Sequence, residues 1–261
     1  MNARDFWYRR DDFIPVVGHR GICAHYPENT LVSFQAAIDC GVDLIEFDVN
    51  VTKDGELVVI HDNTVDATSD HTGRTRDYTL AELKTFDFGV NFPDKFSGER
   101  IPTLREVLEL VTRKSDTLLL NVEIKDKEHE TVDKTIAMLG EFGLCERSVI
   151  ACFDAEIIRY TKTAYPDMRT QGFPGRYMNN FTEDTYDVMF GMGIPISWKD
   201  CTPEGIRADI EFAKKRGILA WLFIADTPDA VRSCIGYGCD NVTGNDPAVA
   251  LETLRSLKLH G

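Results

Sequence analysis

Residues 44–62 read LIEFDVNVTKDGELVVIHD, and this stretch decides the fold that the sequence predicts. It holds two strand-like runs, Leu44–Val51 and Glu56–His61, which are separated only by Thr52–Gly55. A parallel crossover needs a dozen or more residues, so this link cannot form one. Asp-Gly between two such runs is a strong signal for a two-residue hairpin loop. We therefore expect Glu56–His61 to return antiparallel along the preceding strand.

Outward from this hairpin, predicted strands alternate with predicted helices. With the hairpin return set aside, eight strands remain: Pro15–Gly18, Leu44–Val51, Thr117–Ile124, Ser148–Phe153, Arg169–Phe173, Ile194–Trp198, Leu219–Ile224 and Asn241–Gly244. The helices expected between them are Thr30–Cys40, Thr103–Arg113, Glu130–Phe142, Ala155–Ala164, Thr182–Phe190, Pro203–Arg216 and Pro228–Ile235. Such alternation indicates parallel strands with crossover helices, and eight strands are the number that closes a barrel.

The predicted fold class is therefore α/β, a TIM (β/α)8 barrel with a small insertion after the second strand. We expect one barrel domain over residues 1–261, a length typical of this fold. The insertion covers about residues 63–100 and contains one short helix, Leu80–Phe86.

The charge of the chain narrows the classes of partner. Lys and Arg number 29 against 43 Asp and Glu, which gives a formal net charge of −14. This balance argues against nucleic-acid binding and against docking on anionic lipid, both of which need cationic surface. A local metal ion or arginine can still bind an anionic substrate in a cleft. The oligomeric state stays open.

The cellular location is predicted from what the sequence lacks. No stretch approaches the roughly 18 apolar residues of a membrane span, so we expect no stable membrane anchor. Met1–Pro15 is polar, without the apolar core of a signal peptide. The seven cysteines are scattered and include no CxxC pair, which is typical of reduced thiols in a cytoplasmic protein.

Charged side chains gather where the predicted strands end, and the active site of a barrel forms at these carboxyl ends. His19 follows the first strand, Glu46 and Asp48 lie on the second, Glu123 lies on the third, and His61 ends the hairpin return. A lone carboxylate or histidine on a strand is often only structural. The whole set at neighbouring strand ends points to chemistry.

The hairpin register brings these groups closer together. If Asp54-Gly55 is a two-residue loop, the numbers of opposed residues add to 109 and Asp48 faces His61. The two-residue period of a strand places Glu46 on the same face as Asp48. Together with Glu123, three carboxylates then converge, and they repel unless a cation or a proton neutralises them. Oxygen ligands suit Mg²⁺ or Ca²⁺.

The other histidines lack such surroundings. We expect His25 and His71 in loops, and His129 and His260 on the surface.

The order and spacing of these motifs resemble those of the glycerophosphodiester phosphodiesterase family. Order and spacing agree from about residue 16 to 125, over His19-Arg20-Gly21, Pro27-Glu28-Asn29-Thr30, Glu46-x-Asp48, Thr52-Lys53-Asp54-Gly55, His61-Asp62, Ile101-Pro102-Thr103-Leu104 and Glu123-Ile124-Lys125. The second half matches more thinly. Cys152-Phe153-Asp154 resembles the family's Ser-Phe-Asp, and Trp221 opens what is usually a Trp-Thr-Val-Asn run but is here followed by Leu222-Phe223-Ile224.

The resemblance implies a metal-dependent hydrolase of glycerophosphodiesters on a TIM barrel. The mechanism of this family is usually drawn with the glycerol hydroxyl of the substrate attacking the phosphorus first. This step gives a cyclic phosphate that water then opens. The resemblance also implies roles for individual residues: His19 and His61 as acid and base, Glu46, Asp48 and Glu123 as ligands of one divalent cation, Arg20 and Lys125 on the phosphate, and Phe153 and Trp221 on the substrate.

The residues alone support similar roles. A phosphodiester needs its charge neutralised, which a divalent ion with Arg and Lys can do, and needs protons moved at two oxygens, which two histidines can do. Which histidine is the base, which cation binds, and which alcohol leaves stay open.

Two other functions remain as alternatives. Phospholipase D-like action on a lysophospholipid would need an apolar barrel mouth, for which the sequence offers Phe92, Phe96, Phe173, Tyr177 and Met178. A non-catalytic phosphate-binding barrel is disfavoured, because a degenerate protein should have lost at least one member of the set of two histidines and three carboxylates.

Overall fold

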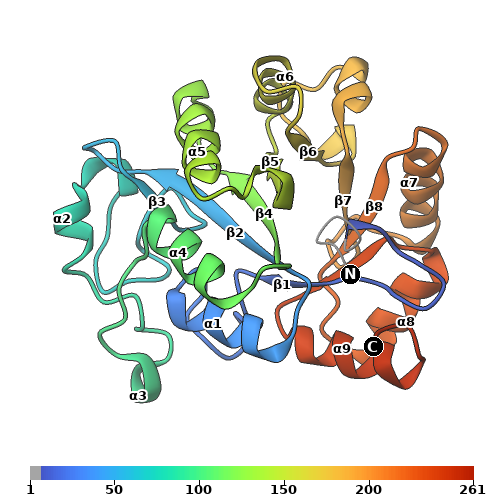
Figure 1. Cartoon of the computed structure of the whole chain (residues 1–261), viewed down its shortest axis with the longest axis horizontal. Helices are drawn as coiled ribbons and strands as arrows, with labels where there is room; N and C mark the ends of the chain where they lie inside the picture. The colour runs from blue at the N-terminus through green and yellow to red at the C-terminus, as the bar shows by residue number, and fades with distance from the viewer. Residues whose placement is uncertain (1–6) are drawn as a thin grey trace.

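A computed structural model describes residues 7–261, and it has the predicted barrel. Figure 1 shows helices arranged in a ring around the central strands. Eight parallel strands follow the order β1-β9-β8-β7-β6-β5-β4-β2, and pairing of β1 with β2 closes the sheet. Their bounds are β1 Val16–His19, β2 Leu44–Val51, β4 Leu119–Ile124, β5 Ser148–Ala151, β6 Arg169–Gly172, β7 Gly191–Pro195, β8 Leu219–Phe223 and β9 Asn241–Gly244.

The barrel helices begin at side-chain caps. The Thr30 hydroxyl accepts from Ser33 N, and Thr103 forms a capping box with Glu106. The helices are α1 Leu31–Cys40, α4 Leu104–Lys114, α5 His129–Glu141, α6 Ala155–Ala164, α7 Pro203–Lys215, α8 Pro228–Tyr237 and α9 Pro247–Ser256. The predicted helix Thr182–Phe190 is instead a 3₁₀ helix, η5, over Glu183–Val188, and shorter 3₁₀ helices span Cys145–Arg147 (η3) and Gly175–Tyr177 (η4).

The hairpin is antiparallel as predicted, but its predicted register is wrong. Strand β3, Leu57–Val59, pairs with β2 so that Val49 faces Val59. The loop has three residues rather than two, because Thr52 N bonds to Glu56 O at 2.9 Å and Gly55 takes a left-handed φ of 81°. The additional loop residue shifts the register by one, so Asp48 lies opposite Ile60 and not His61.

The insertion after the hairpin packs outside the ring of helices. It contains the 3₁₀ helix Thr75–Asp77 (η2) and two short helices, α2 Leu80–Leu83 and α3 Pro93–Phe96, which Figure 1 shows at the edge of the molecule. Helix α2 is shorter than the predicted Leu80–Phe86. A small apolar core, including Val65 and Phe86, joins the insertion to the hairpin residues Val58 and Ile60.

The amino-terminal end of the barrel is closed by aromatic packing. The Trp7 ring stacks on Trp221, with centroids 5.9 Å apart and planes 12° apart, and meets the edge of Phe190 at 5.7 Å. These rings pack with Val17 and Leu44, near the beginnings of β1 and β2. The open end of the barrel is therefore the one formed by the carboxyl ends of the strands.

Strand β7 begins three residues before the predicted strand Ile194–Trp198. The additional residues include Gly191 and Gly193, which the sequence pattern did not place in a strand. A Cβ atom added at Gly193 would lie 2.7 Å from Phe173 Cε1, and one added at Gly191 would lie 3.0 Å from Trp221 Cζ3. The close approach of these rings requires glycine here. The apolar pattern of the sequence placed the strand later, because glycine carries no apolar signal.

His260, predicted on the surface, is buried instead. The side chain of His260 is 6% exposed and its Nε2 lies 2.9 Å from Asp43 Oδ2. The chain returns to the barrel after α9, where Ile14 N donates to Leu259 O at 2.8 Å. The other predictions for histidines are confirmed, since His25 and His71 lie in loops and the His129 side chain is 44% exposed at the start of α5.

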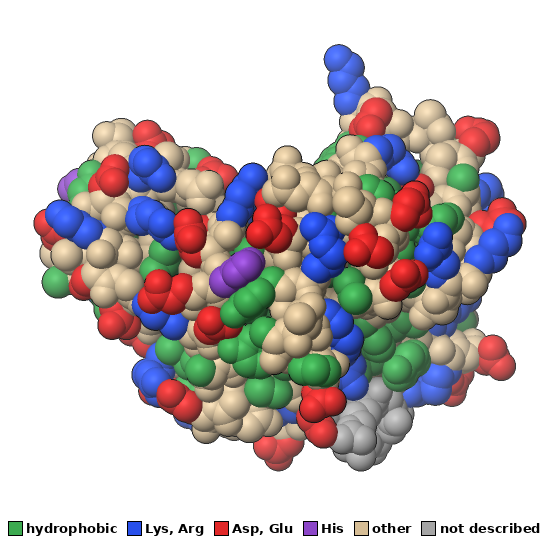
Figure 2. Space-filling view, turned by 90° about the horizontal axis from the view of Figure 1, so that it is seen from above, with side chains coloured by type: hydrophobic (Ala, Val, Ile, Leu, Met, Phe, Trp, Pro, Cys, Tyr) green, Lys and Arg blue, Asp and Glu red, His purple; other side chains and the backbone are tan. Residues whose placement is uncertain are grey.

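The surface is mixed in charge. Figure 2 shows acidic and basic side chains interspersed on the face it presents, with hydrophobic side chains gathered near its centre. Among residues 7–261, no helix combines the length and the apolar character needed to cross a membrane.

Candidate active site

One cavity of about 170 Å³ lies at the carboxyl ends of the barrel strands. Its lining includes all nine residues that the sequence predicted for the site: His19, Arg20, Glu46, Asp48, His61, Glu123, Lys125, Phe153 and Trp221. The structure therefore brings the whole predicted set together, although the register that was expected to place His61 is wrong. His61 reaches the cavity from the segment after β3.

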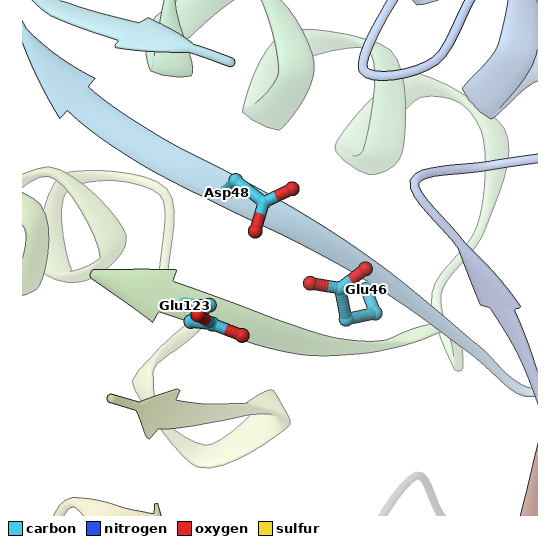
Figure 3. A group of neighbouring side chains, drawn as sticks. All are labelled: Glu46, Asp48 and Glu123. Carbon is cyan, nitrogen blue, oxygen red and sulfur yellow. The ribbon is translucent and has the colours of Figure 1, made fainter. Parts of the chain in front are cut away.

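The three carboxylates converge because of the strand pattern. Glu46 and Asp48 alternate along β2, and Asp48 pairs with Glu123 in the β2–β4 register. One oxygen from each residue lies within 4.8 Å of the others, and all three residues are buried. Figure 3 shows the three carboxyl groups gathered over the two strands.

Two cations lie against these carboxylates. Lys125 Nζ is 3.0 Å from Asp48 Oδ1 and donates a hydrogen bond to Glu123, while Arg20 Nε is 3.4 Å from Asp48 Oδ2. Burial alone would raise the pKa of Asp48, but Lys125 and then Arg20 overcome it and lower that pKa. Burial, followed by repulsion from Asp48 and Glu123, raises the pKa of Glu46 well above its ordinary value. The cluster thus holds more negative charge than its own cations balance.

The donor set fits a divalent ion. When all are ionised, Glu46, Asp48 and Glu123, with Glu28 on Arg20 at 2.9 Å, carry two more charges than Arg20 and Lys125 balance, and burial and mutual repulsion raise the pKa of Glu46 unless a cation binds. Within residues 7–261, buried Asp48 Oδ1 has Lys125 Nζ at 3.0 Å as its ionic partner but accepts no hydrogen bond of regular geometry, while Asn29 Nδ2 donates to the other oxygen at 2.8 Å. Oxygen donors alone, all carboxylates, are what Mg²⁺ and Ca²⁺ prefer.

Hydrogen bonds fix the tautomer of His19. Asn245 Nδ2 donates to Asp226 Oδ2 at 2.7 Å, so the amide oxygen of Asn245 faces His19 Nδ1, also at 2.7 Å. An amide oxygen only accepts, so His19 Nδ1 carries the proton and Nε2 holds the lone pair. His19 Nε2 lies 3.9 Å from Glu46 Oε2. Burial, and next the charge of Arg20, lowers the pKa of His19 to about 4.

His61 has a different partner. Its Nδ1 lies 2.7 Å from Asp62 Oδ1, and its side chain is 34% exposed. A carboxylate thus faces Nδ1 of His61, whereas a neutral amide faces Nδ1 of His19. Asn50 Nδ2 donates to the backbone oxygens of Ile60 and Asp62, which holds the segment that carries His61 against β2.

Cys23 lies beside His19, with Sγ 3.7 Å from Nδ1, but the pair is not a nucleophilic dyad. The Cys23 thiol donates to Asn245 Oδ1 at 3.0 Å, and Nδ1 of His19 already carries its proton. Burial raises the pKa of Cys23 to about 12, so the thiolate needed for attack is scarce near neutral pH.

The opposite wall of the cavity is aromatic. Phe153 stacks on Phe173 at 3.5 Å, and Trp198 meets the edge of Phe223 at 5.8 Å. The five residues proposed for an apolar mouth do not form one. Phe173 lines the cavity, Tyr177 packs on Trp198 and Met178 is buried, but Phe92 and Phe96 lie in the insertion, where Phe96 contacts Tyr26.

Sequence reasoning missed several groups at this site. Asn245 and Asp226 follow β9 and β8, outside the stretches that the sequence analysis singled out, and Phe223 and Trp198 lie in segments that were predicted only as strands. A polar pair at the ends of the last two barrel strands was the available signal. It became informative only once closure of the barrel placed β9 beside β1.

The comparisons with known proteins show the family of the chain. The sequence model of the glycerophosphoryl diester phosphodiesterase family matches residues 19–249. The chain belongs to this family. It is 34% identical over 245 residues to the glycerophosphodiester phosphodiesterase of Caldanaerobacter subterraneus subsp. tengcongensis, which covers 92% of this chain and 97% of that protein. Members of this family hydrolyse glycerophosphodiesters, and so does this enzyme.

Solved structures of the same fold include two further relatives. One, from Silicibacter pomeroyi, is described as a putative glycerophosphoryl diester phosphodiesterase and superposes with a TM-score of 0.85 at 23% identity, over 100% of this chain and 99% of that one. The other, an Oleispira antarctica phosphodiesterase in complex with the product sn-glycerol-3-phosphate, has a TM-score of 0.82 at 24% identity, over 98% of this chain and 100% of that one.

Proposed function

We propose that this family member hydrolyses a glycerophosphodiester to sn-glycerol 3-phosphate and an alcohol, with one divalent cation and two histidines. The observation that carries the proposal is the joint placement in one cavity of His19, His61 and the three buried carboxylates. The Oleispira antarctica phosphodiesterase, whose structure contains sn-glycerol-3-phosphate, supports the product that we assign.

Glu46, Asp48 and Glu123 would hold the cation, either Mg²⁺ or Ca²⁺. When bound, such an ion neutralises the negative charge of the phosphodiester and orients it. Arg20 and Lys125 would bind the non-bridging phosphate oxygens, because both lie at the cavity with their charges directed to this cluster.

The two histidines would divide the proton transfers. We assign His19 as the base, because its Nδ1 is already protonated and its Nε2 lone pair can take a proton from the attacking hydroxyl. We assign His61 as the acid that protonates the leaving alcohol oxygen, because Asp62 orients its ring through Nδ1 and His19 takes the role of base. In a first step through the glycerol hydroxyl, the new P–O bond closes a cyclic phosphate as the bond to the alcohol breaks. Water then opens the ring with the two roles exchanged.

The aromatic wall would hold the organic part of the substrate. The Phe153 ring, stacked on Phe173, offers a flat apolar surface to carbon chains. Trp221 is 3% exposed and forms the floor of the cavity with one side while packing on Trp7 with another. We therefore propose contact with substrate for Phe153 and a supporting contact for Trp221.

The cellular setting belongs to the same proposal. All seven cysteines are free thiols, three of them buried, which suits a reducing cytoplasm. The insertion shares its small core with the hairpin residues Val58 and Ile60, so we propose that residues 1–261 act as one catalytic domain on a small-molecule phosphodiester. A negative net charge of −14 makes nucleic acid an unsuitable partner.

Purified protein with a panel of glycerophosphodiesters, in MgCl₂ or CaCl₂, tests the proposal by coupled detection of sn-glycerol 3-phosphate. We expect cation-dependent release that chelation abolishes and that a His19→Ala variant lacks. A lysophospholipid in the same panel tests the alternative reaction. Full activity in excess chelator would contradict the assigned cation site, and hydrolysis of the lysophospholipid alone would replace the proposed substrate.

A further inference from the structure

A second cavity of about 270 Å³ opens beside the catalytic one, and the two share Lys125. It is formed by the beginning of the insertion and by the loop between β4 and α5. Asn50 and Val51, at the carboxyl end of β2, and Lys125, which follows β4, also line it, so the second cavity lies on the catalytic side of the barrel. None of the roles proposed above uses its other residues.

The lining of this cavity is rich in cations. Arg74, Arg76, Lys125 and Lys127 line it, against two acids, Asp126 and Glu128. A local excess of positive charge is unexpected in a chain whose net charge is −14. Clefts lined by one sign of charge concentrate ligands of the opposite sign.

The two acids are occupied by other partners. Arg76 Nη2 lies 3.1 Å from Asp126 Oδ2, and Arg76 Nη1 lies 3.9 Å from Glu128 Oε1. Asp126 also accepts from Thr131 Oγ1 at 2.7 Å and from Glu128 N at 3.1 Å, near the start of α5. The single charge of Arg76 balances one of these two acids, and Arg74, Lys125 and Lys127 supply the other positive charges of the lining.

The remaining cations can turn toward a ligand. The exposed Arg74 side chain forms no ion pair with any residue between 7 and 261. Lys127 is 64% exposed, and its Nζ lies 3.4 Å from Asp154 Oδ2, a distance that allows exchange of partners. A guanidinium and an ammonium at one opening match a phosphate monoester, which carries up to two negative charges.

The second cavity lies near His61 and therefore near the alcohol half of the substrate. Asn63, two residues after His61, lines it, and Asn50, which holds the His61 segment, lines it as well. His61 is the residue to which we assign protonation of the leaving alcohol. The glycerol half carries no anion apart from the reacting phosphate, so a second anion must belong to the alcohol.

We propose that this cavity is a subsite for a phosphate monoester on the alcohol half of the diester. The inference rests on the proposed function and specifies the class of substrate that the site prefers. Arg74 and Lys127 bind the second phosphate while Lys125 lies between it and the reacting phosphate.

Two substrates that differ only in this phosphate test the subsite: glycerophosphoinositol and glycerophosphoinositol 4-phosphate. For the wild-type enzyme we expect kcat/KM to be about tenfold or more higher with the phosphorylated substrate, the size of one charge-assisted contact. Arg74→Gln should reduce this ratio toward one, Arg74→Glu should invert it, and Arg74→Lys should keep part of it. Because Arg74 is exposed, all three variants should keep the wild-type Tm.

Lys53→Gln is the matched control, because Lys53 is an exposed cation on the neighbouring hairpin loop and does not line the cavity. It should leave the ratio unchanged. Equal kcat/KM for both substrates in the wild type, or a ratio that Arg74→Gln and Lys53→Gln lower equally, would overturn the subsite while leaving the proposed function intact. Hydrolysis of no glycerophosphodiester in the wider panel would overturn the proposed function itself.

Discussion

The two walls of the catalytic cavity are built from the same parts, the strand ends of one barrel, yet they carry opposite chemistry. The wall from β1, β2, β3 and β4 supplies every charged residue in the lining, including His19, Asp48 and Lys125. The wall from β5 to β8 supplies aromatic rings such as Phe153 and Phe223, with no charged side chain in the lining. We propose that this difference separates bond breaking from recognition of the organic groups.

This separation predicts different effects on kcat and KM for the two walls. Groups on the charged wall interact with charge that changes in the transition state, so their loss should lower kcat. Rings on the aromatic wall contact parts of the substrate that do not react, so their loss should mainly raise KM. The following variants test whether the two walls divide the work in this way, in order of expected effect.

The largest effect is expected from Glu46→Gln on the charged wall. Loss of one cation ligand should lower kcat by about 10³-fold or more. Because burial already raises the pKa of Glu46, a neutral amide there should not lower the Tm of the cation-free protein. The rise in Tm on adding MgCl₂ or CaCl₂ should disappear, as scanning fluorimetry would show.

Glu156→Gln, an exposed acid on α6, is the control for that change and should retain both activity and the cation-induced rise in Tm. A Glu46→Gln enzyme that is still stabilised by the cation would remove Glu46 from the metal site.

His19→Ala and His61→Ala come next, and each should cost about 10²–10⁴ in kcat. A substrate whose leaving alcohol has a low pKa needs no general acid, so it should restore much of the His61→Ala rate and little of the His19→Ala rate. Single-turnover rates with the two kinds of substrate would measure this. Recovery in His19→Ala instead would reverse the assignment of acid and base.

Asn245→Ala should have a smaller effect, about 10–100-fold on kcat with KM little changed, because Asn245 positions His19 without touching the reacting atoms. A pH–rate profile adds a readout beyond stability, since loss of the amide partner frees Nδ1 of His19 and alters the limb that reports the base. An unchanged profile with an unchanged kcat would assign the Asn245–Asp226 pair to structure alone.

The smallest catalytic effect belongs to the aromatic wall. Phe153→Ala and Trp198→Ala should each raise KM by up to about tenfold while kcat stays within a few-fold. Trp198 is 38% exposed, so its variant should keep the wild-type stability. Trp221→Ala should instead cost about 3–5 kcal/mol of unfolding free energy, because Trp221 is 3% exposed and packs on Trp7. A fall in kcat with an unchanged KM for Phe153→Ala would break the division between the walls.

The same two walls show how far sequence reasoning reached. The charged wall was predicted residue by residue, because buried carboxylates such as Glu46 contrast with their apolar neighbours. The aromatic wall was predicted only at Phe153 and Trp221, because the sequence does not distinguish an aromatic residue that lines a cavity from one that packs in the core. β7 was misplaced because Gly191 and Gly193 leave room for rings from other strands, and that room is a property of the closed barrel.

Long-range closure explains the other misses. His260 carries no local sign of burial, and only the return of the chain to Asp43, distant in sequence, buries it. Asn245 likewise meets His19 across 226 positions of sequence. The hairpin register failed for a local reason, because Asp-Gly is compatible with both two-residue and three-residue loops, and the Thr52–Glu56 bond selects the longer one.

The three-residue loop at Lys53–Gly55 also determines where this gene can change length during evolution. Side chains alternate along β3, so adding or deleting a single codon here would exchange Val59, which packs in the barrel core, with Val58, which packs in the small core of the insertion. A few dozen residues later, near the exposed Gly98, an added codon would lengthen only a surface connection, at a small entropic cost. Among descendants of this sequence, the hairpin loop should therefore keep one length while the insertion varies freely.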